Sequence, residues 1–227
     1  PVREGDSAAL HRRIAYIPGD VTLWPSLTGA ETIDMLGRLR GSGNRTRLAS
    51  LIDEFHLDPS KSCRSYSKGN RQKVALVAAF ASDADLLVLD EPTAGLDPLM
   101  ERAFRSRVHE ATGRGVTVLL SSHMLSDVEK LCDTVTIIRE GRTIDSGCLA
   151  DMQQLARVTI EAKLSQSDAV FPESHGVRIS RRDHANIQLQ VAADRLTDVL
   201  GIFAELGVDD FQCRRPSLEE IFLRHYE

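Results

Sequence analysis

Continuous apolar runs alternate with helical spacing in the middle of the chain. Residues 86–90 (LLVLD) and 116–120 (VTVLL) are apolar runs of strand length. Between them, residues 98–113 carry a helical pattern that ends in glycines. A strand, a helix and a second strand of this kind predict a mainly parallel sheet with helices on both faces. The crossover between the strands is expected to be right-handed.

Local signals place further elements around this sheet. Thr28 and Glu31 have the spacing of a capping box, which predicts that a helix starts at Thr28. Residues 46–57 have helical spacing, and the stretch around 66–70 is predicted to be a loop that leads into a buried helix. The apolar run at 135–141 predicts a strand, paired with residues 142–147 as a hairpin.

The pattern changes after about residue 156. Apolar and polar residues alternate at 158–164, 177–183 and 186–192, which predicts half-exposed antiparallel strands. An amphipathic helix pattern follows at 193–207. We therefore expect two domains, a main domain at 1–155 and a small α+β accessory domain at 156–227.

Composition narrows the possible partners. The 227 residues are 42% hydrophobic and 27% charged, and the net charge of −5 argues against a nucleic-acid partner. No apolar run approaches the roughly 20 residues of a membrane span, so we expect a soluble chain that can still dock on a membrane protein. The four cysteines show no metal-ligand spacing.

Two adjacent carboxylates, Asp90 and Glu91, end the first central strand. Ligands of parallel α/β sheets bind at the carboxyl ends of strands. A divalent cation with a phosphate-bearing ligand would relieve the repulsion of this pair. His123 follows the neighbouring strand and is expected at the same crevice. Each feature alone has a plainer reading, a helix N-cap for the acidic pair and an ordinary surface residue for the histidine.

Taken together with the stretches YSKGNRQ and AGLDP, these residues resemble the ATP-binding cassette (ABC) family, in particular ATPase subunits of export-type transporters. The resemblance implies a P-loop-NTPase-like sheet, with ATP and Mg²⁺ as ligands. It assigns LLVLDEP to the Walker B strand, with Asp90 as the Mg²⁺ ligand and Glu91 as the catalytic base. It also implies that His123 contacts the γ-phosphate and that Asp97 of the D-loop faces a second cassette.

The stretch YSKGNRQKV resembles the family's signature sequence, with Ser67 and Gly69 matching and Lys68 and Asn70 departing from the commonest form. A serine hydroxyl, a glycine and a helix N-terminus together make an anion site. In the family this site closes on ATP held by the opposite subunit. The resemblance therefore implies a homodimer or pseudo-dimer of cassettes.

The segment IAYIPGD resembles the family loop that usually carries a metal-sensing glutamine. This chain has Gly19 at that position, followed by Asp20, which is a weaker candidate for the metal. No G-x-x-x-x-G-K-[ST] stretch occurs in the sequence. We therefore expect a cassette that is incomplete at the N-terminus, truncated or naturally degenerate, and inactive alone.

The resemblance implies an ATPase subunit of an exporter, paired with a separate transmembrane permease at the inner face of the cell membrane. Two alternatives stay open, a catalytically incompetent or regulatory cassette fragment and a non-transport ABC ATPase.

Overall fold

A computed structural model describes residues 7–41, 45–155, 157–166, 171 and 176–223. The chain divides into two compact units, residues 1–124 (unit 1) and 125–227 (unit 2), and each is described by itself. The predicted division at 155/156 falls inside unit 2 and stays a prediction.

Unit 1 is built on a three-stranded parallel sheet. Its strands are β1 (Ile14–Ile17), β2 (Leu86–Asp90) and β3 (Thr117–Ser121), in that spatial order. Strand β2 pairs in parallel with both neighbours, and Asp90 lies opposite Ser121. The predicted parallel sheet is confirmed, and the carboxyl ends of its strands share one edge.

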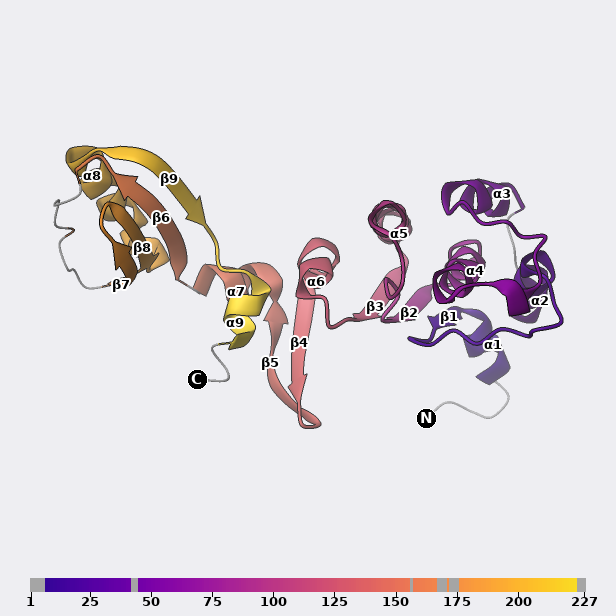
Figure 1. The fold of residues 1–227 in the computed structure, drawn as a ribbon. Coiled ribbons are helices and arrows are strands. Elements are labelled where there is room, and N and C mark those ends of the chain that lie inside the picture. The colour runs from indigo at the N-terminus through magenta and orange to yellow at the C-terminus, as the bar shows by residue number, and fades with distance from the viewer. Residues whose placement is uncertain (1–6, 42–44, 156, 167–170, 172–175, 224–227) are drawn as a thin grey trace. The chain divides into compact units, whose positions relative to one another are not determined.

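Helices flank this sheet on both sides (Figure 1). Helices α3 (Arg45–Glu54), α4 (Lys68–Phe80) and α5 (Pro98–Gly113) lie on one side, and α1 (Ser7–Arg12) lies on the other. Helix α2 (Gly29–Arg40) packs beside α4, and a short 3₁₀ helix, η2 (Cys63–Ser65), precedes α4. The α4 side holds the core of the unit, where the rings of Phe80 and Phe104 are 6.0 Å apart.

The predicted capping box starts α2 as expected. The Thr28 hydroxyl accepts a hydrogen bond from the Glu31 amide at 3.2 Å, and the Glu31 carboxylate accepts one from the Thr28 amide at 2.7 Å. The bond from the Thr28 amide, and a second from the Thr28 hydroxyl to the same carboxylate at 2.9 Å, favour the ionised form and lower the pKa of Glu31. Gly41 ends the helix in the left-handed conformation that glycine adopts most easily.

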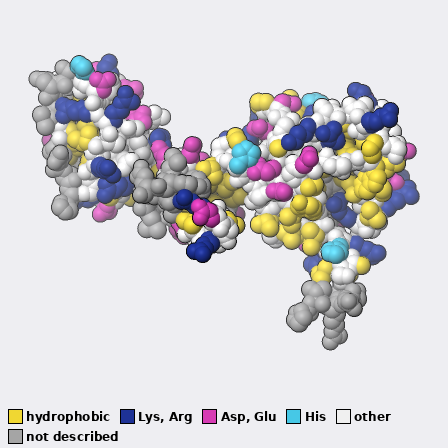
Figure 2. Space-filling model, turned by 60° about the horizontal axis from the view of Figure 1, so that its bottom comes forward, with side chains coloured by type: hydrophobic (Ala, Val, Ile, Leu, Met, Phe, Trp, Pro, Cys, Tyr) yellow, Lys and Arg dark blue, Asp and Glu magenta, His cyan; other side chains and the backbone are white. Residues whose placement is uncertain are grey.

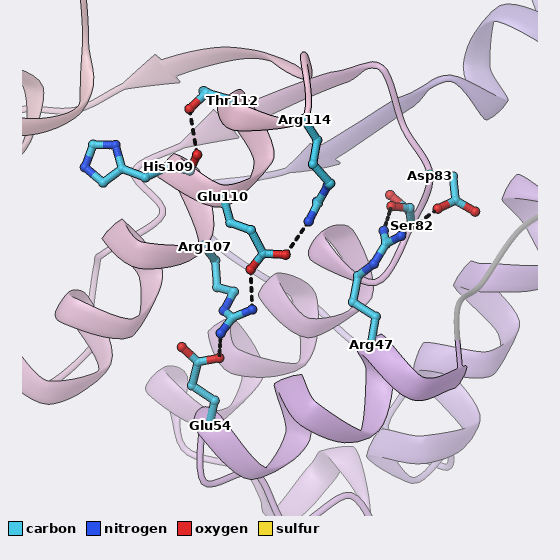
Figure 3. A network of polar contacts seen from close by, with 9 residues as sticks. All are labelled: Arg47, Glu54, Ser82, Asp83, Arg107, His109, Glu110, Thr112 and Arg114. Carbon is cyan, nitrogen blue, oxygen red and sulfur yellow. Dashed lines mark hydrogen bonds and ion pairs between the residues drawn. The ribbon is translucent and has the colours of Figure 1, made fainter.

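A network of ion pairs joins α3 to the elements around it (Figure 3). Arg107 of α5 reaches Glu54 of α3 at 2.7 Å and also pairs with Glu110. Arg47 of α3 donates to the carbonyl oxygen of Ser82, just after α4, at 2.9 Å. The network fixes α3 against α4 and α5, so the helices above the sheet form one block.

Some apolar side chains of unit 1 stay at the surface. On the face of the sheet that α1 shares, Tyr16 is 54% exposed and Leu119 is 61% exposed. Hydrophobic side chains form contiguous patches on unit 1, the right-hand body in Figure 2. Exposed patches of this kind are typical of surfaces that meet another element or another protein.

Unit 2 contains a β-hairpin with helices packed on it. Its elements are α6 (Leu125–Leu131), β4 (Thr134–Arg139), β5 (Arg142–Cys148), α7 (Leu149–Leu155) and α9 (Leu218–Leu223). The predicted hairpin pairing of β4 with β5 is confirmed. The core of this part is a small apolar cluster formed by Val128, Val135, Ile137, Leu149 and Leu218.

The rest of unit 2 is an antiparallel sheet covered by one helix (Figure 1). Its strands are β6 (Val158–Leu164), β7 (Val177–Asp183), β8 (Asn186–Val191) and β9 (Val208–Arg214), in the order β7-β8-β6-β9. The helix is α8 (Leu196–Leu206), preceded by η3 (Ala193–Arg195). The apolar side chains of the alternating strands face this helix, among them Ile160 and Leu189, which are fully buried. The predicted antiparallel strands are confirmed.

The buried ring of Phe104 gives a test of the packing of unit 1. The substitution Phe104→Ala is expected to lower the free energy of unfolding by about 3–5 kcal/mol, because it leaves a cavity between α4 and α5. Arg102→Ala, on the exposed face of the same helix, is the control and is expected to change it by less than about 0.5 kcal/mol. Urea denaturation measures both, and equal effects would contradict this packing.

Candidate active site

Asp90 lies at the carboxyl end of β2, between the ends of its two neighbours. The Ser121 hydroxyl, at the end of β3, donates a hydrogen bond to one carboxylate oxygen. The Gly19 amide, just after β1, donates to the other oxygen at 3.4 Å. Asp90 is therefore held in place from both sides of its strand.

Glu91 turns the chain sharply away from β2. Its φ of 45° is in the left-handed region, which L side chains adopt at a cost of about 1–2 kcal/mol. The conformation is supported by a hydrogen bond from the Glu91 amide to the Ser121 carbonyl oxygen at 3.0 Å. Strained backbone held in this way is typical of functional sites.

The Glu91 carboxylate holds His123 through two contacts. It accepts a hydrogen bond from the His123 amide at 3.0 Å and meets the ring nitrogen Nδ1 at 2.7 Å. The Glu91 side chain is 29% exposed and that of His123 is 74% exposed, so water reaches both. Since Nδ1 is engaged, Nε2 is the ring nitrogen that can meet a ligand. The structure thus brings Asp90, Glu91 and His123 to one edge of the sheet, and their roles stay predictions.

The predicted signature residues lie at the start of α4. The Ser67 hydroxyl caps the helix by accepting a hydrogen bond from the Asn70 amide at 3.3 Å. Ser67 and Lys68 are exposed. Gly69 was expected in a loop but lies in the first turn of α4. The reason is that Ser67 caps the helix, which therefore begins at Lys68. In the described structure, none of the four residues at 67–70 bonds to Asp90, Glu91 or His123, so they form a second, separate cluster.

This second cluster touches the loop at 91–97 of the same chain. A Cβ on Gly69 would lie 2.5 Å from the carbonyl oxygen of Gly95, so only glycine permits this approach. Gly95 itself has a φ of 81°, which glycine adopts without strain. Asp97 ends the loop as the N-cap of α5, where its carboxylate accepts hydrogen bonds from the Leu99 and Met100 amides, both at 3.0 Å.

Gln72 was not predicted as a site residue. It is 1% exposed, and its side-chain amide donates a hydrogen bond to the carbonyl oxygen of Pro92 at 3.0 Å. A signal for it exists in the sequence, because Gln72 precedes the buried Leu76 by one helical turn and so points to the core side of α4.

The residues present suit a single-carboxylate magnesium site. Within the described ranges, no group of three or more His, Cys, Asp or Glu side chains could hold a metal by itself. Mg²⁺ commonly keeps several waters and binds one or two carboxylates together with the phosphates of a substrate. Asp90 fits that pattern. Asp20, the weaker candidate, is exposed and makes no hydrogen bond in the described structure, so nothing orients it toward Asp90.

Comparisons with known proteins identify the family. A family model described as ABC transporter matches residues 1–94. The chain is 30% identical to the uncharacterised ABC transporter ATP-binding protein YhaQ of Bacillus subtilis, over 94% of this chain and 74% of that protein. It is 31% identical to the daunorubicin/doxorubicin resistance ATP-binding protein DrrA of Streptomyces peucetius, over 94% of this chain and 70% of that protein. The chain belongs to the family of ABC transporter ATP-binding proteins.

Solved structures of ABC proteins support the cassette fold. One, titled the structure of an ATP-binding subunit of an ABC transporter, has 34% sequence identity and a TM-score of 0.63 over 67% of this chain and 66% of that one. Another, a dimer of the ATP-binding cassette MJ0796 bound to ADP and Pi, is 18% identical with a TM-score of 0.58 and bears on the fold alone. No helix in the described part of this ABC protein is long and apolar enough to cross a membrane.

The contact of Gly69 with Gly95 is directly testable. Gly69→Ala is expected to lower the free energy of unfolding by about 1–3 kcal/mol, because the added methyl overpacks the loop at 91–97. The Ala94 and Leu96 amides, which donate to the Glu91 and Thr93 carbonyl oxygens, should exchange hydrogen faster as the loop shifts. Denaturation and hydrogen–deuterium exchange measure the two effects.

Gly113→Ala is the matched control. A Cβ there meets nothing within 4 Å, so stability should stay unchanged or rise by up to about 1 kcal/mol. A Gly69→Ala protein as stable as the control, with unchanged exchange, would show that the loop does not require this glycine.

Proposed function

We propose that this chain is the ATP-binding and ATP-hydrolysing subunit of an ABC exporter that works with a separate membrane permease. The observation that carries the proposal is the pairing of Glu91 with His123 beside Asp90 at one edge of the sheet. Phosphoryl transfer to water needs a carboxylate that binds the metal ion, a base that accepts a proton from water, and a group that contacts the phosphate, such as an imidazole.

The proposed roles rest on the positions of these side chains. Asp90 would hold Mg²⁺ directly or through water, and Mg²⁺ would neutralise charge on the phosphates of ATP. Glu91 lies one residue further along, partly exposed, where it can orient a water and accept its proton. The contact of the Glu91 carboxylate with Nδ1–H orients the imidazole of His123, and Nε2 would donate to the γ-phosphate when the ring carries a proton on both nitrogens.

The second candidate site is separate from the acidic cluster of this chain. It consists of Ser67, Lys68, Gly69 and Asn70. A capped helix N-terminus with an exposed serine and lysine suits an anion. We propose that these four residues and Asp97 meet ATP bound by a second cassette, so that the working unit is a dimer. The relatives named as drug-resistance ATP-binding proteins favour the exporter reading. A permease partner would place the chain at the inner face of the membrane.

The role of Glu91 is tested by Glu91→Gln in the full natural chain, assayed together with its permease. The variant is expected to lower kcat at least about 100-fold, because an amide cannot take a proton from water, and to bind ATP as before. Glu140→Gln is the control, since Glu140 also has a positive φ (50°) but is exposed outside the site. Equal hydrolysis by wild type and Glu91→Gln would remove the assignment.

A permease partner is tested by affinity purification of the chain from detergent-solubilised membranes of its natural host. A polytopic membrane protein is expected to co-purify in a fixed ratio to the chain. Trp24 is half-exposed in the loop after β1, and exposed apolar side chains are typical of surfaces that bind a partner, so Trp24→Ser should lower the recovery of the membrane protein. If the chain is a fully active ATPase and no membrane protein co-purifies with it, the result would favour a non-transport ABC ATPase.

A further inference from the structure

One face of α4 is fitted to the loop that carries Glu91. Gly69 and Gln72 lie three positions apart and so share a face of the helix. Gly69 accepts the close approach of the Gly95 carbonyl, and Gln72 donates a hydrogen bond to the Pro92 carbonyl at 3.0 Å. The loop is thereby anchored to α4 near both of its ends.

The hydrogen bond donated by Gln72 is buried, and the residue that accepts it, Pro92, directly follows Glu91 in the chain. Gln72 is 1% exposed, and Pro92, whose carbonyl it holds, is buried next to Glu91. A buried carbonyl oxygen that loses its donor is costly, so the loop would move to find another partner. Glu91 has a strained φ of 45° and would be the first residue to relax with it.

We propose that Gln72 is a positioning residue for Glu91. Its side-chain amide links the Pro92 carbonyl oxygen to α4. The N-terminus of this helix carries Ser67, Lys68, Gly69 and Asn70. This inference rests on the proposed ATPase function and deepens it. A nucleotide that binds at the N-terminus of α4 would change the position of Glu91 in the same chain through the Gln72 hydrogen bond.

Gln72→Met tests this link, because methionine fills a similar volume but donates no hydrogen bond. In the chain as it stands, NMR should show displaced amide resonances for Glu91 and Ala94 and displaced ring resonances for His123, at fixed pH. Leu76→Met is the matched control, since Leu76 is also fully buried on α4 but carries no hydrogen-bonding group. If both variants leave the three residues' resonances unchanged, the proposal is overturned.

Kinetics on the full natural chain with its permease separate positioning from binding. Since a misplacement of about 1 Å can cost roughly 100-fold in rate, Gln72→Met is expected to lower kcat at least about tenfold. KM for ATP should stay within about twofold, because no group that meets ATP is removed. An unchanged kcat would overturn the positioning role even if resonances move. If the wild type itself hydrolyses no ATP, the proposed function fails, and the NMR comparison still decides the link.

Gln72→Glu covers the case in which Gln72→Met does not fold. A buried carboxyl favours its neutral form, which can donate to Pro92, whereas the carboxylate cannot. Compared with wild type at each pH, the amide resonances of Glu91 and residues 93–96 should match at pH 6 and diverge at pH 8. The same difference at both values would overturn the proposal.

Discussion

The parallel pairing of β2 with β3 is the constraint on which the candidate site depends. In the observed register Asp90 lies opposite Ser121, so the loops that follow both strands start at the same level of the sheet. A slip by one residue would turn Asp90 to the other face and take its carboxylate away from the Ser121 hydroxyl. The buried Leu87 and Leu89 oppose such a slip, because it would bring them to the other face. Packing of the core thus fixes the geometry of the polar edge.

The loop after β2 is held by contacts from outside itself. Its left-handed residue, Glu91, is unfavourable in isolation, but the Ser121 carbonyl, the His123 amide and the His123 ring all bind it. Three contacts that agree can maintain one strained conformation. The same contacts give the carboxylate a fixed direction at the crevice, so the strain and the placement of the candidate base have one cause.

How far the sequence predicts this arrangement depends on the range of each signal. The apolar runs of β2 and β3 and the Thr28–Glu31 cap are local, and the structure confirms them. The meeting of Glu91 with His123 was also predictable, because parallel neighbours bring their carboxyl ends together. The hydrogen bond from Gln72 to Pro92 was not, since nothing in the local pattern of a buried glutamine names its partner. The position of Gly69 in a helix was not predicted, because a Ser-x-Gly stretch is compatible both with a loop and with a helix that Ser67 caps.

The C-terminal helix shows that the accessory part is tied to the element that follows His123. Helix α9 has six residues, too few to be stable alone, so tertiary contacts must hold it. Its Leu218 is 1% exposed in the cluster with Val128 of α6, and its Leu218 amide donates to the Glu129 carboxylate. Two hydrogen bonds of 2.7 and 2.8 Å from Arg214 to Glu220 join α9 to β9. Helix α6 therefore packs on the last described helix, α9. Within unit 2, a displacement of β9 would therefore act on α6 through α9.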